Sequence, residues 1–141
     1  MATIGQARYW LEQANVSPTE RKACDAEIAE KVAESEAIAA GFLSSARVTA
    51  HESGSAGFDL SVEARDEAKA LAEAIRSGRV PANEARKQLE SLTAKLARAA
   101  DHRCRFERAI ESIEGIEADP IAWMDRLHET FPAVQPHFSF L

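Results

Sequence analysis

The chain has 141 residues, 45% of them hydrophobic and 28% charged, and a net charge of −6. This length fits one folded domain, and the negative charge argues against nonspecific binding to nucleic acid or to an anionic membrane, because both need a dominant positive field. No apolar run approaches the length of a membrane span and the first residues lack the pattern of a signal peptide, so we expect a cytoplasmic or otherwise intracellular protein that no signal peptide directs to secretion.

Helix signals dominate the first third of the chain. A short helix is expected over about residues 3–14. Ser17, Pro18 and Glu20 then form a capping box with proline at the first helical position. They predict a long helix over about residues 18–50, with Gly41 as the place for a bend.

Residues 51–61 gather glycine and serine without a helical period, so they are interpreted as an internal linker. A third helix follows from Ser61 to about Ser77, with Gly78 placed to end it. Pro81 opens a fourth helix, over about residues 81–114, that stops at Gly115. Asp119 and Pro120 start a fifth helix that ends by Phe131, because Pro132 follows.

The fourth helix carries the most specific pattern in the chain, a four-three apolar spacing typical of a coiled-coil seam. Arg103 stands where one core residue should be, so it is a candidate for fixing register or partner choice, or for reaching past the core to water. The residues predicted to pair this helix with another are Leu89, Leu92, Leu96, Phe106, Ile110 and Ile113.

These elements predict an all-α fold in a single helical domain spanning 1–141. We expect an elongated helical bundle with two long helices (about 18–50 and 81–114) in a coiled-coil-like stalk, three shorter helices and an extended apolar tail at 132–141. Aromatic residues gather near the two ends of the chain, so the first helix, the fifth helix and the tail should pack together.

Charge suggests how the long helices pair. The second helix is acidic between Asp25 and Glu36, and the fourth is basic between Arg98 and Arg108. An antiparallel pairing with Cys24 opposite Arg108 would bring these stretches together, if the linker runs back along the bundle. Simple hairpins would make the two helices parallel instead.

No pattern in the sequence indicates catalysis. A phosphate-binding loop, a nucleophile elbow and a recognisable metal-ligand set are all missing, and the pair Asp125 and His128 lacks the further ligands of a di-iron bundle. Cys24 and Cys104 are isolated and are expected to be reduced. The sequence predicts no enzyme, no cofactor, no metal and no small-molecule substrate.

Function is therefore expected to lie in protein contacts, with a partner protein or through self-association. The first hypothesis is a structural or assembly subunit of a larger complex, and the second is a small adaptor or inhibitor of one partner. The third is a nucleic-acid-associated regulator using the basic cluster at 98–108. The tail would dock on a partner or on the chain's own helices, and the residues predicted to contact a partner are Arg103, Phe138, Phe140 and Leu141.

Overall fold

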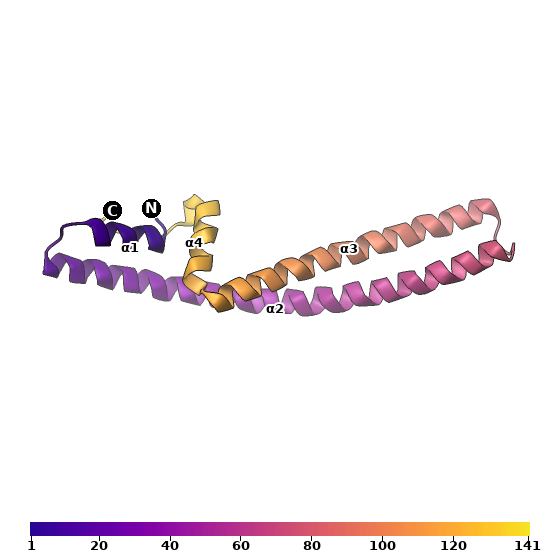
Figure 1. Cartoon of the computed structure of the whole chain (residues 1–141), viewed down its shortest axis with the longest axis horizontal. Helices are drawn as coiled ribbons and strands as arrows, with labels where there is room; N and C mark the ends of the chain where they lie inside the picture. The colour runs from indigo at the N-terminus through magenta and orange to yellow at the C-terminus, as the bar shows by residue number, and fades with distance from the viewer. The chain divides into compact units, whose positions relative to one another are not determined.

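The computed structural model describes residues 1–141 and contains helices with no strand. Figure 1 shows α1 (Ile4–Gln13), α2 (Pro18–Arg76), α3 (Ala82–Ala118) and α4 (Pro120–Thr130), followed by the short 3₁₀ helix η1 (Pro132–Val134). The predicted all-α class is confirmed.

Most helix ends lie where the sequence places them, because capping residues fix them. At α1 the Thr3 side chain accepts a hydrogen bond from the Gln6 amide at 3.1 Å, and the Gln6 side chain accepts one from the Thr3 amide at 2.9 Å. The Asp119 carboxylate caps α4 by accepting from the Ala122 amide at 3.0 Å. These local bonds satisfy backbone donors that a helix start leaves unpaired.

Helix α2 ends at a glycine turn. Gly78 has a φ of 69°, in the left-handed region. The Arg79 amide donates to the Ala74 carbonyl and the Gly78 amide to the Ile75 carbonyl, both at 3.1 Å. This is the Schellman arrangement that glycine favours at a helix end.

The prediction of a linker at 51–61 is wrong, because α2 continues through these residues without a break. The glycines of this segment lie on the side of α2 that meets α3. A Cβ atom at Gly54 would be 3.2 Å from Cδ2 of Phe106, and one at Gly57 would be 3.3 Å from Cβ of His102. Glycine and serine serve here as small helical residues that allow a close approach between two helices, and not as breakers.

The chain divides into two compact units, whereas the sequence pointed to one domain. The terminal unit comprises Met1–Ser45 and Ser112–Leu141, and the hairpin unit comprises Ala46–Glu111. Helices α2 and α3 contribute residues to both.

The terminal unit holds the apolar core of the chain. One cluster joins α1, the start of α2 and the tail through Ile4, Ala7, Leu11, Cys24, Ile28 and Phe138. A second cluster joins α2, α3 and α4 through Ala39, Ile116 and Met124. The expectation that the first helix, the last helix and the tail pack together is confirmed, and Figure 1 shows both chain ends beside α1.

Helix α3 does not stop at Gly115 as predicted but continues to Ala118. A Cβ atom at position 115 would be 2.8 Å from Cδ1 of Trp123. The glycine therefore leaves space for the indole ring of Trp123 on α4, while remaining part of helix α3. Sequence reasoning cannot distinguish this use of glycine from a helix end.

In the hairpin unit, the second half of α2 and the first part of α3 lie side by side and antiparallel (Figure 1). Gly54 lies opposite Phe106, and Gly57 lies opposite His102. The basic stretch of α3 therefore packs against the middle of α2, and the predicted pairing with the acidic stretch between Asp25 and Glu36 is wrong.

Candidate protein-interaction face

The two helices of the hairpin unit meet through small side chains. The buried positions follow a four-three spacing, so one stripe of each helix faces the other. These positions are Ala50, Ser53, Gly57, Ala64 and Leu71 in α2, with Leu92, Ala99 and Ala109 in α3. Only Leu71 and Leu92 among them are large apolar residues, so the hairpin alone buries little apolar surface.

The predicted and the observed seams of α3 agree at every second core position. At the positions between these, the inward residue is the one that precedes the predicted residue. Leu92 is buried as expected, but Leu89 and Leu96 are exposed. The intervening inward positions are occupied instead by Lys95, half-buried His102 and buried Ala109. Two overlapping four-three patterns share Ala85, Leu92, Ala99 and Phe106, and the seam that forms follows the pattern that continues through Lys95, His102 and Ala109.

The charged residue in the seam is Lys95 and not Arg103. The Lys95 side chain is 16% exposed, whereas that of Arg103 is 81% exposed. The Lys95 ammonium pairs with the Glu67 carboxylate and lies 3.4 Å from the Glu63 carboxylate. The hydrogen bond to Glu67 is the main cause that raises the pKa of Lys95 above its usual value.

Four large apolar side chains of the hairpin unit lie outside the seam. Phe58, Ile75, Leu89 and Leu96 are 70%, 52%, 55% and 52% exposed. On each helix these residues belong to a stripe whose members directly follow the seam residues in the sequence. We call these two stripes the outer apolar face; its members are His51, Gly54, Phe58, Ser61, Arg65, Ala68, Ala72 and Ile75 on α2, with Arg86, Leu89, Thr93, Leu96, Ala100, Arg103, Glu107 and Ile110 on α3.

A groove shows that the two stripes share one side of the hairpin. It has a volume of about 500 Å³ and lies between Gly54, Phe58 and Ser61 of α2 and Leu96, Ala100 and Arg103 of α3. Ala99, Gly57 and the half-exposed Phe106 ring also line it. Glycine at 54 and 57 leaves this space open, because neither position carries a side chain that could fill it.

The other side of the hairpin is charged. The positions that precede the seam residues include five acidic side chains on α2, and four basic and two acidic ones on α3: Glu52, Asp59, Glu63, Asp66 and Glu73, with Lys87, Arg98, Arg105, Arg108, Glu84 and Asp101. A helix pair that needed only its own seam would be polar on both remaining sides. The side with Phe58, Ile75, Leu89 and Leu96 exposes large apolar residues between charged ones such as Arg65 and Arg86, so it has the character of a contact surface.

The basic cluster at 98–108 is partly neutralised by carboxylates of the same helix. Arg103 lies 3.3 Å from a Glu107 oxygen, and Arg105 lies 2.9 Å from an Asp101 oxygen. Both pairs are exposed, so each contributes little stability. Nothing in this geometry favours nucleic acid as a ligand.

The structure separates the predicted partner contacts of the tail. Phe138 is buried in the terminal unit, so its assignment as a partner contact is wrong. Phe140 is partly buried and stacks on Trp10 with ring centroids 5.3 Å apart. Leu141 is half exposed, and Ile110 and Ile113 are partly buried.

Hydrogen bonds hold the tail on its own helices. The Glu27 carboxylate accepts from the Ser139 amide and from the Ser139 hydroxyl, both at 2.7 Å, and the Ala2 amide donates to the Pro136 carbonyl at 3.2 Å. The bond from the Ser139 amide is the main cause that lowers the pKa of Glu27. Of the two predicted docking sites for the tail, the chain's own body is the one observed.

The titratable residues singled out from the sequence cap a helix or lie apart from one another. Asp125 accepts from the Ile4 and Gly5 amides at 3.1 and 2.9 Å, so it caps α1 and is not free to act as a ligand. The buried Nδ1 atoms of His102 and His128 lack a hydrogen-bond partner, and the two residues lie on different helices, α3 and α4. No group of three or more His, Cys, Asp or Glu side chains is arranged to hold a metal ion.

Sequence reasoning missed Phe58, Ile75 and the glycines as part of a face. The available signal was a four-three spacing of small and apolar residues that runs from Gly54 through Phe58, Ser61, Ala68 and Ala72 to Ile75. The linker interpretation hid it, because it divided the stripe between a loop and a separate helix.

Comparisons of the chain with protein-family models, with curated proteins and with solved structures found no match. None of the helices combines the length and the apolar character needed to cross a membrane. The proposed function therefore rests on the geometry of the chain itself.

Proposed function

We propose that this protein is a non-catalytic interaction protein, a structural or assembly subunit, whose hairpin unit presents the outer apolar face to another protein. The observation that supports the proposal is the placement of large and small residues. Phe58, Ile75, Leu89 and Leu96 lie outward, while most of the buried seam positions are alanine, glycine or serine and only Leu71 and Leu92 are large. A hairpin that functioned alone would place the large side chains inward, where their burial stabilises it most.

Coiled-coil-like packing is part of the proposal. The four-three spacing on α2 and α3 suits a left-handed pairing of the two helices, and the second stripe on each helix suits a further layer of helices packed against the first. The protein would thus contribute two helices to a bundle that its partner completes. Its free thiols, Cys24 and Cys104, fit a reducing intracellular compartment.

A pair of matched variants tests this function. Leu96→Glu puts a charge on the outer apolar face, whereas Ala94→Glu puts the same charge on the charged side, because a shift of two residues turns a side chain by about 200° around a helix. Both positions are exposed, so neither substitution opens a core.

The experiment is affinity capture of the tagged full chain from its native host, with an untagged copy of the chain coexpressed. The proposal predicts a protein recovered in stoichiometric amount with the unmodified chain and with Ala94→Glu, and lost with Leu96→Glu. Equal recovery with all three chains would show that the outer apolar face is not a binding surface.

A further inference from the structure

The outer apolar face has the dimensions of a stable interface. A helix segment of about 30 residues is roughly 45 Å long and each helix is roughly 10 Å wide, so two helices present about 900 Å². A standard protein interface buries about 800 Å² on each partner. One face of the hairpin unit is therefore sufficient for a stable complex.

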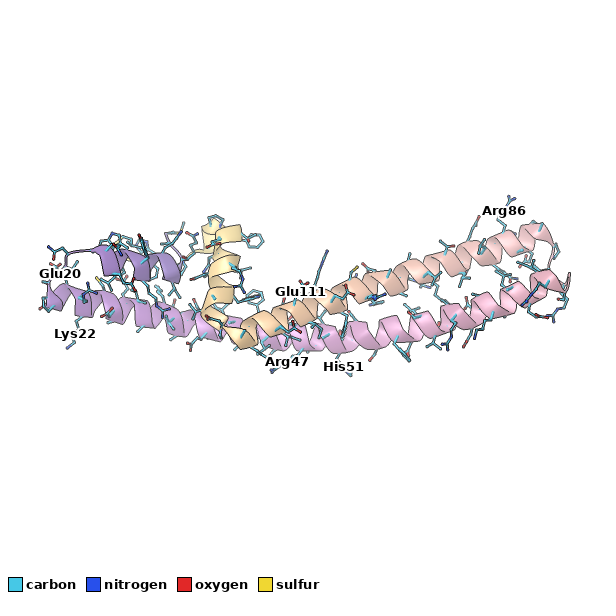
Figure 2. The ribbon with its side chains drawn as sticks, in the orientation of Figure 1. Glu20, Lys22, Arg47, His51, Arg86 and Glu111 are labelled. Atoms are coloured by element: carbon cyan, nitrogen blue, oxygen red, sulfur yellow. The ribbon has the colours of Figure 1, made fainter.

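The occupant can be argued from the charges along the outer edges of this face. The edge of α2 carries basic residues, Arg65, Lys69 and Arg76. The edge of α3 carries Glu90, Glu107 and Glu111, with one basic residue, Arg86. Figure 2 shows two edge positions, His51 on α2 and Arg86 on α3, and both side chains project away from the neighbouring helix. In the antiparallel register Glu90 lies at the height of Lys69, within the basic stretch of α2, while Glu107 and Glu111 lie level with residues 52 and 48. The basic stretch of α2 is therefore complemented by Glu90 on the other edge of the same unit.

We propose that the outer apolar face of the hairpin unit binds the same face of a second copy of this chain, with α2 of each copy against α3 of the other. Such a complex has a two-fold axis parallel to the helices. It forms an antiparallel four-helix bundle whose two layers are the two hairpins. This inference rests on the proposed function and names the partner.

The antiparallel register identifies a specific ion pair in this complex. Gly57 lies opposite His102; Lys69 is twelve residues after Gly57, and Glu90 is twelve residues before His102. Lys69 and Glu90 therefore lie at the same height on the two edges. Neither takes part in an ion pair within the chain. A two-fold axis parallel to the helices keeps heights equal, so Lys69 of one copy faces Glu90 of the other, twice per dimer.

The groove supplies shape complementarity at the centre of the interface. Phe58 follows Gly57 and is at the height of Ala100 and Arg103 on α3. When α2 of one copy lies over α3 of the other, the exposed Phe58 ring enters the partner's groove beside these residues. The two-fold axis repeats the contact. The Arg103 guanidinium can then lie over the incoming ring and make a cation–π contact with it. This contact accounts for an exposed arginine in the groove.

The other symmetric arrangement is disfavoured by charge. A two-fold axis across the hairpin would place α2 on α2 and α3 on α3. The basic edge with Arg65 and Lys69 would then lie beside its own copy, and so would the acidic edge with Glu90 and Glu107. Like charges at close range oppose association and exclude wrong partners.

The test combines the mass of the full chain in light scattering with a charge exchange. The unmodified chain and Ala94→Glu should have twice the 15.4 kDa mass of one chain, whereas Leu96→Glu should raise the dimer dissociation constant by about 100-fold. Helix content from circular dichroism checks that each variant folds. A monomer mass for the unmodified chain, or the same mass for Leu96→Glu and Ala94→Glu, would overturn the proposal.

The charge exchange tests the orientation of the two copies. Lys69→Glu and Glu90→Lys should each weaken the dimer about tenfold, because each creates two like-charge contacts. The double variant should return the dissociation constant to within about threefold of the original. Additive weakening, or no effect of either single variant, would overturn the arrangement. If the captured protein that depends on Leu96 is not the untagged copy, self-association is wrong while the proposed function stands.

Discussion

Gly54 of α2 lies so close to Phe106 of α3 that a Cβ atom at position 54 would be 3.2 Å from the aromatic ring. This contact explains the main departure from the sequence-based expectation, because it shows why the glycines of residues 51–61 belong inside a helix. In the seam of α3, Lys95 takes the inward position next to Leu96 and pairs with Glu63 and Glu67 of α2. Leu96 is thereby placed on the outer apolar face.

The close approach of the two helices can be tested at Gly57. Gly57→Leu should lower the free energy of unfolding by about 1–3 kcal/mol, because an added side chain at a tight contact forces the helices apart. A Cβ atom there would already be 3.3 Å from Cβ of His102 and 3.7 Å from the Ala99 carbonyl oxygen. Urea denaturation followed by circular dichroism provides the measurement.

Gly41 is the matched control for this substitution. Nothing lies within 4 Å of a Cβ atom added at position 41, and the residue is inside α2. Gly41→Ala should therefore raise the free energy of unfolding by about 0.5–1 kcal/mol through helix propensity alone. If Gly57→Leu instead raised the free energy of unfolding, the close contact of Gly57 with α3 would be contradicted.

The tail should contribute to stability through one residue. Phe138→Ala removes a buried ring from the core of the terminal unit, and such truncations cost about 3–5 kcal/mol. Leu141→Ala, at a half-exposed position, should stay within about 0.5 kcal/mol of the original. Thermal and urea unfolding of both variants give the comparison, and equal stabilities would mean that the tail does not belong to this core.

Asp125 should stabilise the start of α1. Asp125→Ala leaves the Ile4 and Gly5 amides without their acceptor, so the free energy of unfolding should fall by about 1–2 kcal/mol. Asp125→Asn keeps one acceptor oxygen and should lose less. Hydrogen exchange at the Ile4 and Gly5 amides should quicken most in the alanine variant; unchanged exchange there would exclude the capping role.

The attachment of the tail should depend on pH through Glu27. Folding lowers the pKa of this carboxyl below 4.5, mainly through the bond from the Ser139 amide. The stabilisation is therefore fully present above pH 4.5 and is lost as the pH falls through the lower pKa of the folded state. Trp10 reports the change, because its ring stacks on Phe140 of the tail.

The measurement is Trp10 fluorescence against pH in a Trp123→Phe background. The Trp10 signal should change below pH 4.5 as the tail loosens. Glu27→Gln retains hydrogen-bond acceptor capacity but cannot ionise, so this transition should be absent from it. An identical acid transition in both proteins would assign the effect to another group.

Sequence reasoning predicted the features that depend on local chemistry. Thr3, Ser17 and Asp119 mark helix starts, Gly78 marks a helix end, and the aromatic residues at the chain ends gather in one core. Each of these depends on a residue and its near neighbours, which the sequence displays directly.

The features that depend on two helices at once could not be predicted. Gly54 and Gly115 are residues typical of a helix break. Only the aromatic ring of a neighbouring helix shows that they are contact positions. Likewise, Leu96 is a better core residue than Lys95 by hydropathy. The seam uses Lys95 because Glu63 and Glu67 on the facing helix pair with it, and that pairing is invisible until the register is known.

The most direct test of the central claim is sedimentation equilibrium of the unmodified full chain, from low micromolar to high micromolar concentration. The proposed self-association predicts an average mass that approaches twice the 15.4 kDa chain mass as concentration rises, because the outer apolar face of one copy covers that of another. A mass of one chain at every concentration would contradict it.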